Sequence, residues 1–540
     1  MATRSRPPRG RSLLDVLIVG AGPTGLTLAG QLSAMGSRIR VVDRAADRVH
    51  ESRALAVQPR SLEVLRGLGV ADRLVELGNT SVRLEVRANG RRDRLPLFDL
   101  GLEDTAYPFL LFLSQAETER VLNEHLADRG VAVERRLELV ALEQAKDAVT
   151  CMLRREDGEI EEVSTRFVAG CDGAHSTVRR LAAIPFVGGA YAPTFALADV
   201  EVDGDLDPQV AYAYLARAGV LLFFPLGRPT TWRVIGRLSD ARRTDDRLEL
   251  SDVQALVRSF SDDPIRLRDP AWLTRFGLQH RQARSYRSGR VFLAGDAAHV
   301  HSPAGAQGMN AGIQDAWNLG WKLALVSAGV ADPALLDTYH VERWPVGRSV
   351  IRLSDRAFAA GTSTNPVAAF ARTELAPRAL GLLARLPRAR AAGFRTIADL
   401  GVRYRTSPAV EEGRPPPTGG PRAGGRLPDA RIRQDGADRW LHEALGGPMF
   451  QLLLCGPPER WSESAVDRLR RGRILRVHRL TRTPAAGALH DDRGDAYRRL
   501  GVERVAQYLV RPDGHVGFRS ASADLAQVTA YLDRWLAARP

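Results

Sequence analysis

The chain has 540 residues, of which 44% are hydrophobic and 26% charged. This length predicts two to four domains, and the composition is that of a globular protein, which excludes a fibrous or wholly disordered chain. The formal net charge is +14, but nearly all basic residues are Arg scattered among Asp and Glu, with Lys only at positions 146 and 322. Because no basic stripe forms, we expect no nucleic-acid partner.

Cysteine usage and hydropathy point to the cytoplasm. None of the three cysteines, Cys151, Cys171 and Cys455, forms a C-x-x-C pair, so we predict neither a disulfide framework nor a metal site. No apolar run reaches the roughly 18–20 residues of a membrane span. The basic segment 1–11 leads into a glycine motif, so we interpret it as a disordered tail and not as a signal peptide.

The first motif is a glycine fingerprint between two predicted strands. Residues 14–19 (LDVLIV) read as a buried strand, G-A-G-P-T-G follows, residues 26–35 read as a helix, and residues 37–43 read as a second strand ending at Asp43. Such a unit binds a dinucleotide, with the acidic residue on the ribose, and it leaves FAD and NAD equally open. The candidate residues are Gly20, Gly22, Pro23, Thr24, Gly25, Asp43 and Arg44.

A second motif lies between Arg290 and Lys322. A short apolar strand at 291–293 ends near Asp296, a Pro- and Gly-containing loop follows, and a helix is predicted from about Met309. A carboxylate at a strand end, a glycine loop and a helix N-terminus together form a cradle for a ligand. The alternative is an ordinary strand–loop–helix joint.

These motifs resemble those of class A flavoprotein aromatic hydroxylases, the para-hydroxybenzoate hydroxylase-like monooxygenases. The resemblance rests on the glycine fingerprint at 20, an Asp-Gly pair at 172 followed by S-x-V-R, and a Gly-Asp pair at 295. It departs from the common pattern at Ser302 and Ala306, which leaves the substrate's hydrogen bonds open. Residues that the resemblance implies for FAD are Arg53, Gln115, Asp172, Gly295, Asp296, Pro303, Gly305, Gly308, Met309 and Asn310.

The resemblance also implies a reaction. NAD(P)H, with NADPH favoured, reduces FAD, O2 adds to flavin C4a, and the hydroperoxide hydroxylates an aromatic substrate, here a polycyclic polyketide-type compound. A Baeyer–Villiger-type oxygenase or an oxidase on the same fold is the alternative. No side chain stands out as an acid or base, so the catalytic group is unknown. Pro303 and Arg53 are the best candidates for shaping the flavin site.

The predicted fold class is α/β, in three parts. A Rossmann-like FAD-binding domain spans 1–184 and 286–412, and residues 75–112 contribute to a mainly antiparallel substrate domain at 185–285. A Pro/Gly-rich linker at 413–428 precedes residues 429–540, which resemble a thioredoxin-like domain without C-x-x-C. We expect a monomer or homodimer.

Aromatic residues of the predicted sheet are candidates for the substrate wall. Because neighbouring strand residues point to opposite faces, one of Phe223 and Phe224 should face the cavity and the other the core. The full set of candidates is Tyr212, Tyr214, Phe223, Phe224, Pro225 and Trp232.

Overall fold

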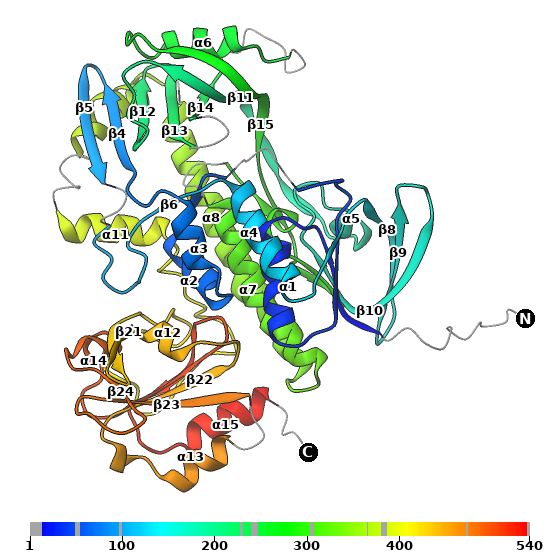
Figure 1. Cartoon of the computed structure of the whole chain (residues 1–540), viewed down its shortest axis with the longest axis vertical. Helices are drawn as coiled ribbons and strands as arrows, with labels where there is room; N and C mark the ends of the chain where they lie inside the picture. Colours follow the sequence, from blue (N-terminus) through cyan, green and yellow to red (C-terminus); the bar gives the residue numbers. More distant parts are fainter. Residues whose placement is uncertain are drawn as a thin grey trace, which may run out of the picture.

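The computed structural model describes residues 13–48, 54–96, 100–226, 231–238, 247–302, 307–363, 365–379, 386–470 and 474–536. These residues form three eight-stranded sheets and a short two-stranded one, β3–β6. The three sheets follow one another along the longest axis of the molecule, with the C-terminal sheet at the end opposite α6 (Figure 1). Within the described ranges, no helix is long and apolar enough to cross a membrane.

The first sheet carries the glycine fingerprint. Its central strand β1 (Leu14–Val19) pairs in parallel with β2 (Ile39–Val42) and with β10 (Ile160–Gly170), and β10 pairs in parallel with β17 (Val291–Leu293). Strands buried on both faces are rich in β-branched residues, which is what the sequence of β1 shows. All four strands end at the same edge, so three motifs meet there: the glycine fingerprint, the Asp172-Gly173 pair (the DG motif) and the Gly295-Asp296 pair (the GD motif).

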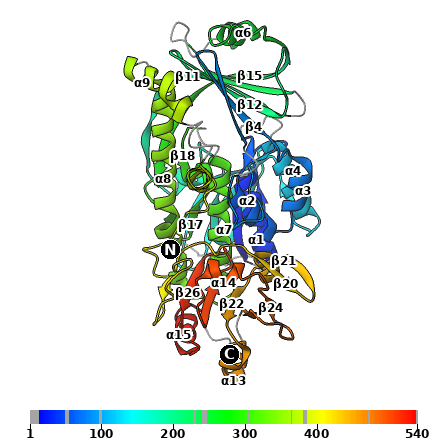
Figure 2. The same cartoon turned by 90° about the vertical axis from the view of Figure 1, so that its left-hand side faces the viewer.

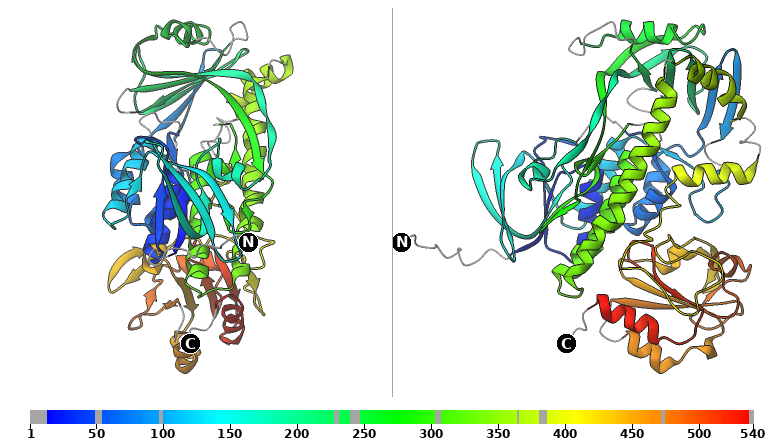
Figure 3. Two further views of the ribbon diagram at one scale, coloured as in Figure 1. Left: turned by 90° about the vertical axis from the view of Figure 1, so that its right-hand side faces the viewer. Right: turned by 180° about the vertical axis from the view of Figure 1, so that it is seen from behind.

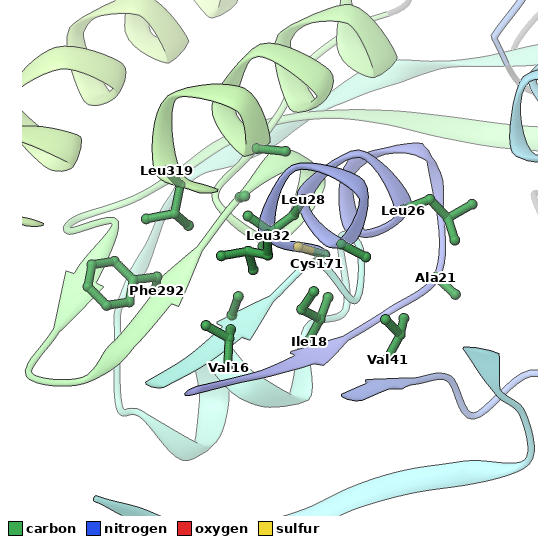
Figure 4. Close-up of a cluster of buried hydrophobic side chains, with 14 of the residues drawn as sticks. Val16, Ile18, Ala21, Leu26, Leu28, Leu32, Val41, Cys171, Phe292 and Leu319 are labelled. Atoms are coloured by element: carbon green, nitrogen blue, oxygen red, sulfur yellow. The ribbon is translucent and has the colours of Figure 1, made fainter. Parts of the chain in front are cut away.

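Helices α1 (Pro23–Ala34) and α7 (Gly308–Ser327) pack on one face of this sheet. Figure 4 shows Leu28 and Leu32 of α1 beside Leu319 of α7, above the strand that carries Val16 and Ile18. Other elements of this part are β3 (Ala56–Val57), α2 (Pro59–Gly67), α3 (Ala71–Leu77), β6 (Leu111–Phe112), α4 (Gln115–Ala127), β7 (Val133–Glu134), β8 (Leu137–Gln144), β9 (Val149–Arg155), α5 (Thr177–Leu181) and β16 (Arg287–Ser288).

The second sheet has the order β18-β15-β11-β14-β13-β12-β4-β5 and is mostly antiparallel. The hairpin at 83–96 turns at Asn89 and Gly90, both with positive φ, and joins it through β4 and β12. Helix α6 covers one face of this sheet (Figure 2). Its members are β4 (Arg83–Ala88), β5 (Arg91–Pro96), β11 (Phe186–Asp203), β12 (Val210–Ala216), β13 (Gly219–Pro225), β14 (Trp232–Arg237), β15 (Arg266–Ala283) and β18 (His299–Val300), and α6 is Leu250–Arg258.

Helices connect the first and third sheets. Helix α8 (Asp337–Thr362) runs alongside the first and second sheets (Figure 3, right) and contains Pro345. It follows the short η2 (Pro333–Leu336) and precedes α9 (Pro366–Phe370), the π-helical η3 (Ala371–Leu375) and α11 (Pro387–Ile397).

The third sheet is compatible with the thioredoxin-like prediction. Its central strand β22 (Phe450–Cys455) is parallel to β23 (Leu475–Thr481) and antiparallel to β25 (Ala506–Val510), which pairs with β26 (Val516–Ser520). Cys455 is fully buried. The remaining elements are β19 (Glu411–Glu412), β20 (Arg431–Gln434), β21 (Ala437–Trp440), α12 (Leu441–Leu445), η4 (Pro458–Arg460), α13 (Glu463–Arg470), β24 (Leu489–His490), α14 (Asp495–Leu500) and α15 (Ala526–Trp535).

The segment 413–428 differs from the free linker that its composition predicts. Strand β19, which precedes it, already belongs to the third sheet through β26. Arg426 is buried and pairs with Glu63 of α2 at 2.9 Å and with Asp104 at 3.1 Å. Proline and glycine indicate only that a segment lacks regular structure. Here the ion pairs of Arg426 fix the segment to the N-terminal part of the chain, and the hydrogen bond from the Gly424 amide to the Val516 oxygen fixes it to the third sheet.

Candidate functional site

The glycine fingerprint forms a tight turn with one open position. Gly20 has φ +105°, and a Cβ there would lie 2.3 Å from the Cys171 carbonyl oxygen, while a Cβ on Gly25 would lie 1.9 Å from the Gly20 oxygen. A Cβ on Gly22, by contrast, would have no atom of the described residues within 4 Å. Gly20 and Gly25 therefore permit the close backbone packing, and Gly22 leaves the space that a pyrophosphate needs.

Asp43 lies beside this turn, where the sequence places it. Its Oδ2 accepts a hydrogen bond from the Ala21 amide at 2.7 Å, and its Oδ1 accepts one from the Ala45 amide at 2.8 Å. A cavity of about 190 Å³ opens here, lined among others by Gly22, Asp43 and the exposed Arg44. This cavity is the candidate site for the adenosine end of a dinucleotide.

The DG motif follows the end of β10 and connects it to α5. Asp172 accepts hydrogen bonds from the amides of Thr177 at 2.7 Å and Val178 at 3.1 Å, so it anchors the start of α5. Burial raises the pKa of Asp172, although these hydrogen bonds favour its charged form. Arg179 donates from Nη1 to the Ala297 oxygen at 2.9 Å, which ties the DG motif to the GD motif.

The GD motif presents Asp296 to solvent at the end of β17. Gly295 has φ +61°, and a Cβ on it would lie 2.6 Å from Thr24 Oγ1. Thr24 therefore packs under the motif, while Asp296 forms no hydrogen bond or ion pair with the described residues. Its carboxylate is free to accept hydrogen bonds from the hydroxyls of a sugar or ribityl chain.

Asp315 of α7 holds this motif in place, and the sequence reasoning missed it. Its Oδ2 accepts from the Gly295 amide at 3.1 Å and contacts His299 Nε2 at 2.7 Å, and its Oδ1 accepts from Arg343 Nε at 2.6 Å. Burial disfavours the carboxylate, but Arg343 and His299 outweigh it and lower the pKa of Asp315. The only sequence signal was an acidic residue within the apolar face of a predicted helix.

The N-terminus of α7 lies next to the same edge. Asn310 accepts from the Gln58 amide at 2.9 Å and donates to the Ala56 oxygen at 2.9 Å, so its side chain fastens the helix start to β3 and α2. Gly308 and Met309 are half-buried in the first turn. The helix begins one residue before the predicted Met309, and the positive end of its dipole favours negative charge.

The remaining candidate residues for cofactor binding lie in other elements or outside the described residues. Gln115 is half-buried in the first turn of α4, and its Nε2 donates to Glu119 Oε1 at 2.8 Å. Pro23 begins α1 behind the glycine turn. Arg53, Pro303 and Gly305 lie outside the described residues.

Most of the predicted substrate wall is wrong. Tyr212, Tyr214, Phe223 and Trp232 are buried in one core with Val253 and Val257 of α6, and Pro225 shares their face of the sheet. Their side chains therefore point away from the first sheet. Aromatic content alone could not reveal which face α6 covers.

Phe224 lies on the opposite face, as strand alternation requires. Its ring centroid is 6.4 Å from that of Phe112 in β6. Phe112 in turn pairs with Ala56, whose oxygen binds Asn310 of α7. The Phe224 face is thus the one that looks toward the α7 start, and the half-buried Leu222 and Ile235 share it.

The geometry fits FAD. The open Gly22 position and the Asp43 cavity suit the adenosine diphosphate half, while the exposed Asp296 and the α7 N-terminus lie at the same sheet edge for the remaining half.

Comparisons with known proteins agree. The FAD binding domain family matches residues 13–354, and the aromatic-ring hydroxylase C-terminal family matches residues 420–539. The chain is 38% identical over 538 residues to 6-methylpretetramide 4-monooxygenase of Streptomyces rimosus, covering 96% of this chain and 93% of that protein. It is 33% identical over 529 residues to a rifampicin monooxygenase of Streptomyces venezuelae, covering 97% of this chain and 99% of that protein.

Solved structures are similar over the same length. The flavin-dependent monooxygenase PieE, in complex with FAD and substrate, superposes with a TM-score of 0.79 at 27% identity, covering 97% of this chain and 99% of that one. Anhydrotetracycline hydroxylase OxyS of Streptomyces rimosus gives a TM-score of 0.76 at 30% identity, with the same coverage. The chain therefore belongs to the FAD-dependent aromatic hydroxylases, and it is an FAD-dependent monooxygenase.

Proposed function

We propose that this monooxygenase hydroxylates a polycyclic, polyketide-type aromatic compound, using NADPH and O2. The observation that carries the proposal is the placement of a partly exposed apolar sheet face, with Leu222, Phe224 and Ile235, opposite the start of α7. Flat aromatic ligands bind in sites that are mostly apolar with a few polar anchors. Relatives named for pretetramide, tetracycline and rifampicin substrates support the polyketide class.

The residues of the chain hold the cofactor and tune its surroundings. When bound, FAD supplies the redox chemistry and the activation of dioxygen. Gly22 and Asp43 would hold its adenosine diphosphate half, and Asp296 its ribityl hydroxyls. The amides at the start of α7 would stabilise negative charge on the reduced ring. Asp315 keeps the GD motif aligned with that helix start.

Water exclusion is the second contribution of the protein. The apolar face around Phe224 would cover the reacting ring and exclude water from it. Exclusion of water would favour oxygen transfer to the substrate over unproductive release of hydrogen peroxide. We assign no residue the role of acid or base, and the protein would contribute by positioning substrate and cofactor.

The test follows labelled oxygen. Purified holoenzyme, NADPH, 18O2 and a tetracyclic polyketide phenol are combined, and the product is analysed by mass spectrometry together with hydrogen peroxide. Hydroxylation predicts one 18O atom per NADPH on an intact ring. A Baeyer–Villiger reaction would insert that atom into an ester or lactone, and an oxidase would give peroxide without incorporation; either result would contradict the proposal.

A further inference from the structure

A buried ion pair lies in the apolar face that looks toward α7. Arg233 of β14 is fully buried. It forms a bidentate salt bridge with Asp199 of β11, in which Nε donates to Oδ1 at 2.7 Å and Nη2 donates to Oδ2 at 2.7 Å. Burying a charged pair costs free energy unless the two groups are well aligned for hydrogen bonding. The contact between Arg233 and Asp199 meets this condition because both of its hydrogen bonds are short.

Strand register fixes the face on which this pair lies. Trp232 and Val234, the neighbours of Arg233 in β14, both belong to the core under α6, so Arg233 points to the other face. It is directly paired with Phe224 across β13, and directly paired residues share a face. The dyad of Arg233 and Asp199 therefore stands beside Phe224, the residue that contacts Phe112.

One end of the guanidinium has no hydrogen-bond partner among the described residues, although its Cζ lies 5.4 Å from the centroid of the Trp272 ring. Arg233 Nη1 is buried and forms no hydrogen bond with any described residue. A buried donor that remains unsatisfied costs free energy, and native proteins rarely keep one without a ligand or a functional reason. The half-buried Leu222, Phe224 and Ile235 on the same face are apolar and cannot accept its protons, and the Trp272 ring beside it offers a cation–π contact but no hydrogen-bond acceptor atom.

We propose that Arg233, held by Asp199, is the polar anchor of the substrate wall and donates from Nη1 to a carbonyl or phenolic oxygen borne by the aromatic ring system. This inference rests on the proposed function and names the substrate class more closely. Asp199 already neutralises the guanidinium, so the dyad offers donors without net charge. A carboxylate would bring an uncompensated buried charge, whereas a carbonyl or phenol oxygen would not.

The test measures binding to the oxidised holoenzyme without NADPH, by titration of the flavin absorbance. The probes are 1-naphthol, naphthalene and 1-naphthoate, which share one ring system and differ in the oxygen they carry. The wild type should bind 1-naphthol roughly tenfold more tightly than naphthalene, the value of one hydrogen bond, and also more tightly than 1-naphthoate. The double variant Asp199→Asn/Arg233→Met should lose this preference while it binds naphthalene as before.

A matched control exists on the other face of the same sheet. Arg275 pairs with Asp252 of α6, with Nη2 and Oδ2 3.2 Å apart, and Arg275 is paired with Ala196 of the α6 core. Asp252→Asn/Arg275→Met should keep the preference for 1-naphthol. Should the double variant at 199 and 233 fold poorly, Arg233→Lys keeps the charge but withdraws Nη1, and it should lower the preference on its own.

Three results would overturn the inference: a wild type without preference for 1-naphthol, an unchanged preference in Arg233→Lys and in the variant at 199 and 233, or the same loss in the control. Hydroxylated product from NADPH and O2 is measured separately. If the holoenzyme prefers 1-naphthol but makes no hydroxylated product, the proposed function is contradicted, whereas the role of Arg233 as an anchor still holds.

Discussion

Arg511, in the turn between β25 and β26, and Glu342 of α8 form a bidentate ion pair in which both side chains are fully buried. Nη1 and Oε1 are 2.6 Å apart, and Nη2 and Oε2 are 2.8 Å apart. Glu342 also accepts from Lys322 of α7 at 2.7 Å, and Asn318 of α7 donates to Asp513 at 3.0 Å. Helix α7, whose first turn lies at the candidate flavin site, is thus fastened through Asn318 and Lys322 to α8 and the C-terminal unit.

Arg511→Met should therefore destabilise the whole chain. The change leaves Glu342 and Asp513 buried with one cation fewer, and breaking such a pair costs about 3–5 kcal/mol. The free energy of unfolding in urea measures this. The control Arg534→Met removes an exposed pair with Glu411, 3.0 Å apart, and should cost less than about 1 kcal/mol. Equal losses in both variants would contradict a structural role for the buried network.

Asp296→Ala should lower the affinity for FAD without changing the stability of the apoprotein. The carboxylate is exposed and unpaired within the described chain, so folding does not depend on it. Loss of charge-assisted hydrogen bonds worth roughly 1.5–3 kcal/mol predicts a dissociation constant about 10- to 100-fold higher. Equilibrium dialysis of FAD measures the constant. Full flavin retention in the variant would remove Asp296 from the site.

Asp315→Asn should affect both stability and FAD binding. The change removes the charge that Arg343 and His299 share and loosens the Gly295 amide, so we expect a loss of roughly 3 kcal/mol or more and weaker flavin retention. Asp337→Asn is the control, because its pair with Arg287 is at the surface and should be worth less than about 1 kcal/mol. An Asp315→Asn protein with native stability and flavin content would refute the role assigned to it.

Phe223→Ala and Phe224→Ala should behave differently although the residues are adjacent. Phe223 is fully buried under α6, so its removal should cost about 3–5 kcal/mol. Phe224 is half-buried on the face toward α7, so its removal should mainly raise KM or uncouple NADPH oxidation from hydroxylation. Thermal unfolding and product-to-NADPH ratios are measured for both. Similar stability losses with unchanged kinetics would show that this face does not line the site.

Asp399→Asn should stabilise the protein at neutral pH. Burial raises the pKa of Asp399 to about 6. The pKa of Asp399 is higher in the folded state than in the unfolded state, where it is about 3.9. The contribution of Asp399 to the free energy of unfolding is therefore fully present below about pH 3.9 and is lost as the pH rises through about 6. At pH 7 the variant should gain roughly 1–3 kcal/mol, and below pH 4 the difference should vanish.

Two features support this substitution. Asn can still accept the hydrogen bond from Gln314 Nε2, whose distance to Asp399 Oδ2 is 3.0 Å, and it tolerates the positive φ of 55° at this position. Urea unfolding at pH 4, 5.5 and 7 measures the trend. A variant whose stability curve runs parallel to that of the wild type would contradict it.

Elements that local patterns encode could be predicted from the residues alone. Strand β1 has the predicted bounds, α2 begins at Pro59, a residue type favoured in a first helical turn, and Ser114 Oγ caps α4 by accepting from the Glu117 amide at 3.2 Å. The glycine, DG and GD motifs could be found because turns and phosphate cradles need particular residues at fixed spacing. Those motifs also led to the family.

Which face of the second sheet is covered depends on long-range packing and could not be predicted from local patterns. Alternation separates Phe223 from Phe224 but cannot say where α6 packs, because that depends on contacts between residues far apart in the sequence. The same holds for Asp315 and Arg343, for Arg233 and Asp199, and for the packing of Arg426 in a segment expected to be a linker. Charged residues reveal a buried role only when the fold brings their partners to them, and no local pattern carries that information.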